Sequence, residues 1–430
     1  MTVDTSEPIG QIHPQPWMLA PETQNLLDAL QANGQTVRFI GGCVRDAVLK
    51  RPVKDIDLAL AMPPETVMTL LRNAGIHVIP TGIDHGTVTA VVGGRHFEIT
   101  SLRVDVETDG RHARVDFTDD WAADAARRDF TINAMSCTAD GYIYDYYGGL
   151  EDLSVGRIRF VGDAQQRIVE DALRILRFFR FYAFYGQPPA DPDALYACQH
   201  GADTVFSLSG ERIRGELLRL LLADDPTVVL RMMRDTGVLS YVLPEAGSGF
   251  DRLEKLCWLE SRALAVETVR PDAIRRLAAL LDADTHASDA AAQRLKLSNS
   301  ERLRLKMALS TTYPIDPEGA PLPLKQGLYR LGTETMRTIA ILTWAGELSR
   351  CAKLPRQRTD AWMGVLGAID AWQPVTFPLT GADVLALGVP QGREVGRVLR
   401  SVETWWEDGG FQVGREQCLD RLREIVATGR

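Results

Sequence analysis

The stretch Phe39-Ile-Gly-Gly-Cys-Val-Arg-Asp46, followed by Lys54-Asp-Ile-Asp-Leu58, predicts both the fold and the chemistry of the N-terminal part of the chain. Residues two apart on a β-strand point to the same side, so Asp55 and Asp57 face one way while the apolar neighbours of Asp57 face the core. Two adjacent carboxylates repel each other unless a cation lies between them, and oxygen ligands at this spacing suit Mg²⁺. An isolated Asp-x-Asp is more often a solvated strand edge or turn, so the interpretation needs support from its surroundings.

Support comes from the glycine pair that follows the preceding strand. Residues Thr36 to Ile40 are expected to form this strand, and Gly41-Gly42 connects it to a helix. Glycines at such a junction let backbone N–H groups approach a phosphate, and Arg45, one turn into the helix, can reach the same anion. Most glycine pairs are simple turns, and no Gly-Lys-Ser/Thr follows to make a Walker loop. Combined with the aspartates, the turn indicates a site where Mg²⁺ ions can activate a hydroxyl and stabilise a leaving pyrophosphate.

The rest of the N-terminal third has a mixed α/β pattern. We expect residues 1–20 to form a loose arm, 21–32 a short helix and 56–60 a second strand. Two β-rich runs flank Gly93-Gly94 and predict a hairpin. The polar, glycine-bearing residues 105–116 predict a mobile loop.

The character of the sequence changes after Gly148-Gly149. From about residue 163 to 310, apolar residues recur at spacings of three and four, which predicts helices. Segments 311–323 and 373–381 are rich in proline, threonine and glycine and are the expected linkers, and the remainder to Arg430 is again helical.

Composition excludes several classes of protein. No apolar run of about 20 residues exists, so no membrane span is expected, and the acidic, proline-bearing N-terminus does not resemble a signal peptide. The six cysteines are scattered without a Cys-x-x-Cys pair, which predicts reduced thiols in the cytoplasm and no zinc site. The net charge of −9 is unusual for a nucleic-acid binder, so any grip on RNA must come from local arginine clusters.

Five ordered motifs between residues 36 and 222 give the chain a specific resemblance. Gly-Gly-x-Val-Arg-Asp with Asp-Ile-Asp is similar to the nucleotidyltransferase motif of the class II CCA-adding enzyme and bacterial poly(A) polymerase family. The other four of the five motifs resemble those of the same family in order: Arg127-Arg-Asp-Phe-Thr-Ile-Asn-Ala134, Tyr147-Gly-Gly-Leu-Glu-Asp-Leu153, Glu170-Asp-Ala-Leu-Arg-Ile-Leu-Arg177 with Arg180, and Ser209-Gly-Glu-Arg-Ile-Arg-Gly-Glu216. A weaker likeness to the family lies outside these motifs, in the tail, at Gly381-Ala-Asp383.

The resemblance implies an α+β fold: a polymerase-β-type nucleotidyltransferase head, with a mixed sheet and helices, followed by an all-α neck, body and tail. It implies addition of C, C and A to the 3′ end of tRNA lacking CCA, from CTP and ATP. No membrane and no obligatory protein partner are implied. The expected divisions are an arm at 1–20, the head at 21–147, the neck at 148–222, the body at 223–372 and a tRNA-binding tail at 373–430.

The family resemblance also implies roles for individual residues. Asp55 and Asp57 would hold Mg²⁺, while Gly42 and Arg45 would contact the triphosphate. Arg128 would lie near the ribose or phosphate of the nucleotide. Arg177 and Arg180 would also belong to the nucleotide site.

Base selection is predicted from a pair of residues in the fourth motif. We expect residues 170–180 to form one helix, on which Asp171 and Arg174 are surface neighbours. An aspartate accepts hydrogen bonds and an arginine donates them, so the pair matches the exocyclic amine and ring acceptor of cytosine and adenine and rejects guanine and uracil. The competing interpretation is an ion pair on a solvated face. Arg177 and Arg180 continue the row at intervals of three.

Several alternatives stay open on the sequence alone. A poly(A) polymerase shares every head motif, an enzyme that adds only A is possible, and so is a catalytically inactive tRNA-binding protein. Glu98 could be a third carboxylate near the metal or an exposed strand residue, and we leave it outside the predicted site. Arg212, Arg214 and Arg219 are either tRNA phosphate contacts or ordinary surface arginines.

Overall fold

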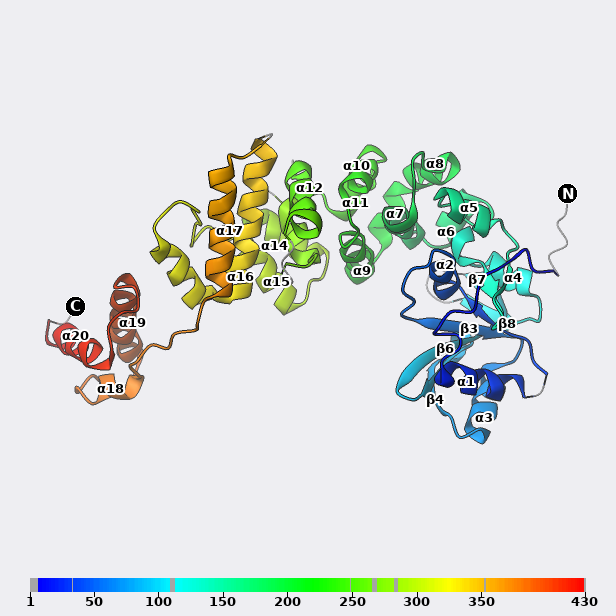
Figure 1. Ribbon diagram of the computed structural model, residues 1–430, viewed down its shortest axis with the longest axis horizontal. Coiled ribbons are helices and arrows are strands. Elements are labelled where there is room, and N and C mark those ends of the chain that lie inside the picture. The colour runs from blue at the N-terminus through cyan, green and yellow to red at the C-terminus, as the bar shows by residue number, and fades with distance from the viewer. Residues whose placement is uncertain are drawn as a thin grey trace. The chain divides into compact units, whose positions relative to one another are not determined.

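The computed structural model describes residues 7–32, 34–108, 113–247, 249–264, 269–281, 285–351 and 353–428 (Figure 1). Its internal contacts divide the chain into two compact units, Met1–Pro244 and Glu245–Arg430. The finer division into arm, head, neck, body and tail stays a prediction. No helix in the described part of the chain is both long and apolar enough to cross a membrane.

A mixed sheet forms the centre of the first unit, as the fold class predicts. Its eight strands follow the order β1-β10-β9-β2-β3-β6-β5-β4, in which β3 and β6 are parallel and the other neighbouring strands are antiparallel. The strands are β1 (Gly10–Gln11), β2 (Val37–Ile40), β3 (Ile56–Leu60), β4 (His77–Gly82), β5 (Thr87–Val92), β6 (Arg95–Ser101), β9 (Ser136–Cys137) and β10 (Tyr142–Tyr144).

One face of this sheet is covered and carries the core. Helices α1 (Pro21–Gln31) and α3 (Pro64–Asn73) pack against β5 and against each other. Leu58 and Phe97, which alternate with polar residues along their strands, are fully buried. The alternation therefore turns Asp57 of β3 and Glu98 of β6 to the other face. The expected hairpin of β5 and β6 around Gly93-Gly94 is confirmed.

Two expectations for irregular segments are wrong in their described parts. Residues 7–20 are not a loose arm, because β1 pairs with β10, Met18 is buried and the ring of Trp17 packs edge-on against Phe39 at 4.8 Å. The expected loop at 105–116 contains the paired strands β7 (Arg103–Thr108) and β8 (Ala113–Phe117). Residues 1–6 and 109–112 lie outside the described part of the chain.

Helices complete the first unit. Phe130, Phe160 and Phe178 are buried together, and the Phe130 and Phe160 rings lie 4.9 Å apart, which joins the end of the sheet domain to α7. The shorter elements here are η1 (Ile83–His85), η2 (Thr131–Asn133) and η3 (Ala202–Ser207). The helices are α2 (Gly42–Val48), α4 (Trp121–Ala126), α5 (Gly149–Val155), α6 (Ala164–Glu170), α7 (Leu173–Tyr185), α8 (Pro192–His200), α9 (Gly210–Leu220), α10 (Thr227–Asp235) and α11 (Leu239–Val242).

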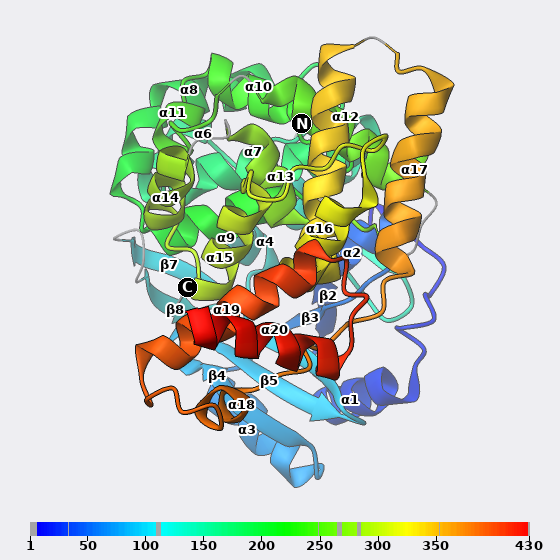
Figure 2. The same cartoon turned by 90° about the vertical axis from the view of Figure 1, so that its left-hand side faces the viewer.

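The described part of the second unit is helical, as expected. Figure 2 shows α16 (Pro321–Arg350) and α17 (Arg356–Asp370), which contact each other along the chain's second unit. The ring of Trp344 on α16 stacks on that of Trp362 on α17, with 6.0 Å between the ring centroids. The expected linkers are non-helical from residue 311 to 320 and from 372 to 380. The remaining elements are α12 (Phe250–Trp258), η4 (Leu259–Ala263), α13 (Ala273–Leu280), α14 (Thr285–Arg294), α15 (Asn299–Ala308), α18 (Gly381–Leu385), α19 (Arg393–Asp408) and α20 (Arg415–Thr428).

The close contact of the third motif with the second generates a stability prediction. A Cβ on Gly149 would lie 2.1 Å from the carbonyl oxygen of Thr131, so Gly149→Ala should force a backbone shift and lower stability by about 2 kcal/mol or more. The matched control is Gly215→Ala in α9, whose Cβ would meet only the end of the Arg219 side chain at 3.4 Å. This control should be neutral or stabilising by up to about 1 kcal/mol. Thermal unfolding checks both, and equal midpoints for the two variants would contradict the packing argument.

Candidate active site

The aspartate pair lies where β3 begins, and Asp57 is on the side of the strand opposite the buried Ile56 and Leu58. Ile56 and Leu58 are buried, whereas Asp57 is half-buried and Asp55, just before the strand, is exposed. Because β6 runs parallel to β3, Glu98 is the register partner of Asp57. The side chains of these register partners therefore project from the same face.

The electrostatics of Asp57 reflect this crowding of carboxylates. Burial raises the pKa of Asp57 to about 6, the negative charges of Glu98 and Asp55 add to the increase, and the positive charge of Arg128 opposes it. Glu98 itself is exposed, so it raises the pKa of Asp57 because its charge lies close to Asp57. Sequence analysis left Glu98 out because no local pattern gives the register between two strands that are distant in sequence.

The donor set fits a divalent cation that binds together with a substrate. Among the residues that the structure describes, no group of three or more His, Cys, Asp or Glu side chains is arranged to hold a metal ion. Mg²⁺ commonly takes one or two carboxylates and completes its octahedron with water and substrate phosphates. Asp55 and Asp57 match that mode, and a cation between them would relieve the repulsion that raises the pKa of Asp57.

The glycine turn lies beside two arginines. Gly41 has φ 68° and ψ −126° and precedes α2, and a Cβ at this position would lie 3.4 Å from Nη1 of Arg128. A Cβ on Gly42 would lie 3.5 Å from Nη2 of Arg45. The positive φ at Gly41 favours glycine, and the absence of side chains brings both guanidinium groups close to the backbone of the turn.

Arg45 is held inside the protein. Its guanidinium donates to both carboxylate oxygens of Asp46 at 3.0 and 2.9 Å and to Oδ1 of Asn133 at 2.6 Å. It also stacks over the ring of Tyr185, 4.2 Å from the centroid. Only 8% of the side chain is exposed. Arg45 is therefore fixed beside the glycine turn, and the Asn133 contact links the first motif to the second. Its expected contact with the triphosphate stays a prediction.

The expectation of one continuous helix from 170 to 180 is wrong. Helix α6 ends at Glu170, Asp171 has an extended backbone with φ −155° and ψ 107°, and α7 starts at Leu173. Oδ1 of Asp171 accepts a hydrogen bond from the backbone N–H of Leu173 at 3.0 Å. An aspartate that satisfies a backbone donor two residues ahead competes with the helical hydrogen bonds, which explains the break.

The two residues of the predicted base-reading pair are held by different partners. Nη2 of Arg212, from α9, donates to both oxygens of Asp171 at 3.0 and 2.8 Å. Nη1 of Arg174 donates to the carbonyl of Arg167 at 2.8 Å and to the carboxylate of Glu170. Asp171 and Arg174 are therefore joined through the backbone, where the Arg174 N–H donates to the Asp171 carbonyl at 3.0 Å, and not through a shared ion pair.

The next two arginines of the row lie on α7 as expected, each with its own acid. Nε of Arg177 donates to Asp129 at 2.6 Å, and Nε of Arg180 donates to Glu216 at 2.5 Å. Burial alone would raise the pKa of Asp129, but the charge and hydrogen bonds of Arg177, with smaller contributions from the second motif, hold it below its usual value. Asp129 thus connects the second motif to the fourth.

Two residues that hold the arginines of the second motif in place were not predicted from the sequence. Asp124 pairs with Arg127 and Arg128, and Arg167 donates to the carbonyl of Arg128 at 2.7 Å. Asp124 precedes the two arginines by three and four positions, and this spacing, typical of neighbours at the end of a helix, is a signal that could have revealed it. Arg167 also pairs with Glu170 at helical spacing, but no local signal gives its contacts to the backbone carbonyls of Arg127 and Arg128, 40 and 39 residues away.

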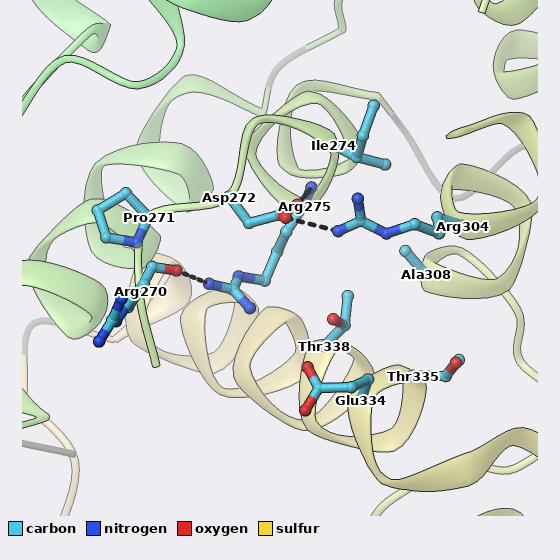
Figure 3. A pocket seen from close by; sticks show the side chains of 10 residues that line it. All are labelled: Arg270, Pro271, Asp272, Ile274, Arg275, Arg304, Ala308, Glu334, Thr335 and Thr338. Atoms are coloured by element: carbon cyan, nitrogen blue, oxygen red, sulfur yellow. Dashed lines mark hydrogen bonds and ion pairs between the residues drawn. The ribbon is translucent and has the colours of Figure 1, made fainter. Parts of the chain in front are cut away.

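A cavity of about 500 Å³ in the second unit does not compete with this site (Figure 3). Its charged groups are largely engaged, since Arg304 binds Asp272, and Arg275 binds Glu260 and the carbonyl of Arg270. The lining residues are Arg270, Pro271, Asp272, Ile274, Arg275, Arg304, Ala308, Glu334, Thr335 and Thr338.

Known proteins share both the motifs and the fold. The family described as the poly A polymerase head domain matches residues 37–159, and the probable RNA and SrmB-binding site of polymerase A matches residues 191–248. A zebrafish (Danio rerio) protein named CCA tRNA nucleotidyltransferase 1, mitochondrial, is 33% identical over 413 residues, which cover 93% of this chain and 90% of that protein. The human protein of the same name is 33% identical, with coverage of 93% and 89%.

A solved structure agrees with these relatives. The Bacillus stearothermophilus CCA-adding enzyme in complex with CTP is 25% identical and superimposes with a TM-score of 0.75, over 96% of this chain and 98% of that one. The similarity therefore extends beyond the head domain to most of the length of the relatives. This chain belongs to the CCA tRNA nucleotidyltransferase family.

Proposed function

We propose that this protein adds C, C and A in turn to the 3′ end of tRNA that lacks CCA, using CTP and ATP and releasing pyrophosphate. The observation that carries the proposal is the position of Asp55 and Asp57 at the start of β3, with the glycine turn and Arg128 close to them. Full-length similarity to CCA tRNA nucleotidyltransferases supports the same reaction.

Each polar group near the turn has a task in this reaction. Mg²⁺, when bound by Asp55 and Asp57, would activate the 3′ hydroxyl of the RNA and stabilise the leaving pyrophosphate. The backbone of Gly42 and the guanidinium of Arg128 would receive the triphosphate, where fixed positive charge is most useful. Arg45 keeps the turn in shape through its bonds to Asp46 and Asn133.

Base selection is assigned to Asp171 and Arg174, as the donor and acceptor pattern predicts. The exposed edges of cytosine and adenine offer an amine to the aspartate and a ring acceptor to the arginine. The bonds of Asp171 to Arg212 and of Arg174 to Glu170 support this role, because they hold both side chains in defined directions before a base arrives. Arg177 and Arg180 are assigned to the same nucleotide site.

A poly(A) polymerase remains the nearest rival. The match to the poly A polymerase head domain does not separate the two activities, since both share the head. The relatives that match over 413 residues are named for CCA addition, which favours that reaction over poly(A) synthesis. We also propose a cytoplasmic location, which the six free thiols suit, although the zebrafish and human relatives are named as mitochondrial.

The first prediction concerns the metal ligands. Asp55→Asn and Asp57→Asn should each abolish nucleotide transfer and leave tRNA binding nearly intact, because each removes a charge that acts on the transition state and not on the RNA. Single-turnover transfer and a filter-binding assay measure the two properties. Asp84→Asn, at an exposed aspartate of the same domain, is the control and should keep full activity. Substantial transfer by either variant would exclude that residue as a ligand.

A second prediction concerns Glu98. Its charge adds to the field at Asp57, so Glu98→Gln should increase the Mg²⁺ concentration required for half-maximal transfer. A like charge at this range contributes about 1 kcal/mol, which corresponds to roughly a fivefold increase. Titration of transfer rate with Mg²⁺ is the measurement. An unchanged Mg²⁺ requirement would show that Glu98 is an ordinary exposed strand residue.

A third prediction tests the base-reading pair. Asp171→Ala and Arg174→Ala should weaken use of CTP and ATP and narrow their advantage over UTP and GTP, because a polar edge of the base is left unpaired. Arg45→Ala should instead lower the use of all four nucleotides by a similar factor, since it supports only the turn. Incorporation of each nucleotide by each variant is measured in single turnovers. If Asp171→Ala kept the parent's selectivity, base choice would lie elsewhere.

A further inference from the structure

Asp124 is a buried carboxylate next to the nucleotide site that none of the five motifs includes. It lies on α4, directly before the second motif, and is 3% exposed. A carboxylate in such surroundings is stable only when its oxygens are paired. The groups that donate hydrogen bonds to Asp124 therefore indicate which side chains it holds in place.

Those partners come from three places. Oδ2 accepts from Nη2 of Arg128 at 3.0 Å, and Oδ1 accepts from Nε of Arg127 at 2.9 Å. Oδ1 also accepts from the backbone N–H of Arg103 at 3.3 Å, where strand β7 begins. Burial would raise the pKa of Asp124, but the charges of Arg128 and Arg127 outweigh it and keep the pKa below its usual value.

The Asp124 contact determines where the guanidinium of Arg128 points. With Nη2 bound to Asp124, Nη1 lies against Gly41. The backbone of Arg128 is fixed as well, because Arg167 donates to its carbonyl at 2.7 Å. Only 17% of the Arg128 side chain is exposed. Arg128 is therefore held at both ends of its length, with one edge of the guanidinium turned to the glycine turn.

We propose that Asp124 is a positioning residue for nucleotide binding, which acts by holding the guanidinium of Arg128 at the glycine turn. The proposal rests on the function proposed above. It assigns no role in base choice to Asp124, because Asp171 and Arg174 lie on a different element. Its effect must therefore be equal for CTP and ATP.

The experiment measures KM and kcat for CTP and ATP with tRNA substrates, in the parent and in Asp124→Asn. The neutral isostere should raise KM for both nucleotides by the same factor, about 10- to 100-fold, the range for hydrogen bonds to a charged group. The preference for CTP and ATP over UTP and GTP should not change. Asp124→Glu should recover part of the loss, and Asp119→Asn, at an exposed aspartate close in sequence, is the matched control with unchanged KM.

A double-mutant cycle shows whether Asp124 acts through Arg128. Asp124→Asn combined with Arg128→Gln should be no worse than Arg128→Gln alone. If Asp124→Asn does not fold, Asp124→Asn/Arg127→Gln carries the same test, because it removes one acid and one cation and still leaves Arg128 unpaired. Circular dichroism at the assay temperature checks the fold.

If the parent protein incorporates CTP and ATP, the proposed function stands, and two results would then overturn the inference. The first is a KM for both nucleotides that Asp124→Asn leaves unchanged. The second is a loss in the double variant equal to the sum of the losses of Asp124→Asn and Arg128→Gln. A parent that incorporates neither CTP nor ATP would overturn the proposed function and this inference with it.

Discussion

Repulsion among the carboxylates of Asp55, Asp57 and Glu98 is the constraint on which the rest of the site depends. Register brings Glu98 beside Asp57, and the pKa of Asp57 rises to about 6, through burial first and then through its acidic neighbours. Three neighbouring carboxylates are stable in their charged form only when positive charge lies close to them. If a nearby arginine formed a permanent ion pair with these carboxylates, no room would remain for a metal ion.

In the part of the chain that the structure describes, the arginines near the three carboxylates do not form ion pairs with them, because each arginine is paired with another acid. Arg128 is paired with Asp124, Arg45 with Asp46, and the arginines of α7 with Glu170, Asp129 and Glu216. Removing one partner from a buried pair leaves an uncompensated charge, which commonly costs about 3–5 kcal/mol. Forming such a pair, however, also removes two charges from water, so the intact pair adds little net stability. Its main effect is to fix the direction of each arginine side chain. It keeps the positive groups close to where a triphosphate and a base would lie, without letting them collapse onto the aspartates.

Local patterns in the sequence were sufficient for the parts of the site built from neighbouring residues. Alternation correctly placed Asp57 between the buried Ile56 and Leu58, and the glycine pair marked the turn before α2. The register of β3 with β6 was not readable, because α3, β4 and β5 separate the two strands in sequence. The break at Asp171 was missed for a related reason. Helical spacing continues through the residue, but its carboxylate binds the Leu173 N–H and an arginine 41 positions later.

The most direct test of this account is to sequence the products made from tRNA lacking CCA when all four nucleotides and Mg²⁺ are present. An Asp–Arg pair that admits only cytosine and adenine, in a site that transfers nucleotides to tRNA, predicts tRNA ending in CCA, with no U or G and no further extension. A poly(A) tail, a single A added only to tRNA already ending in CC, or RNA left unchanged would contradict it.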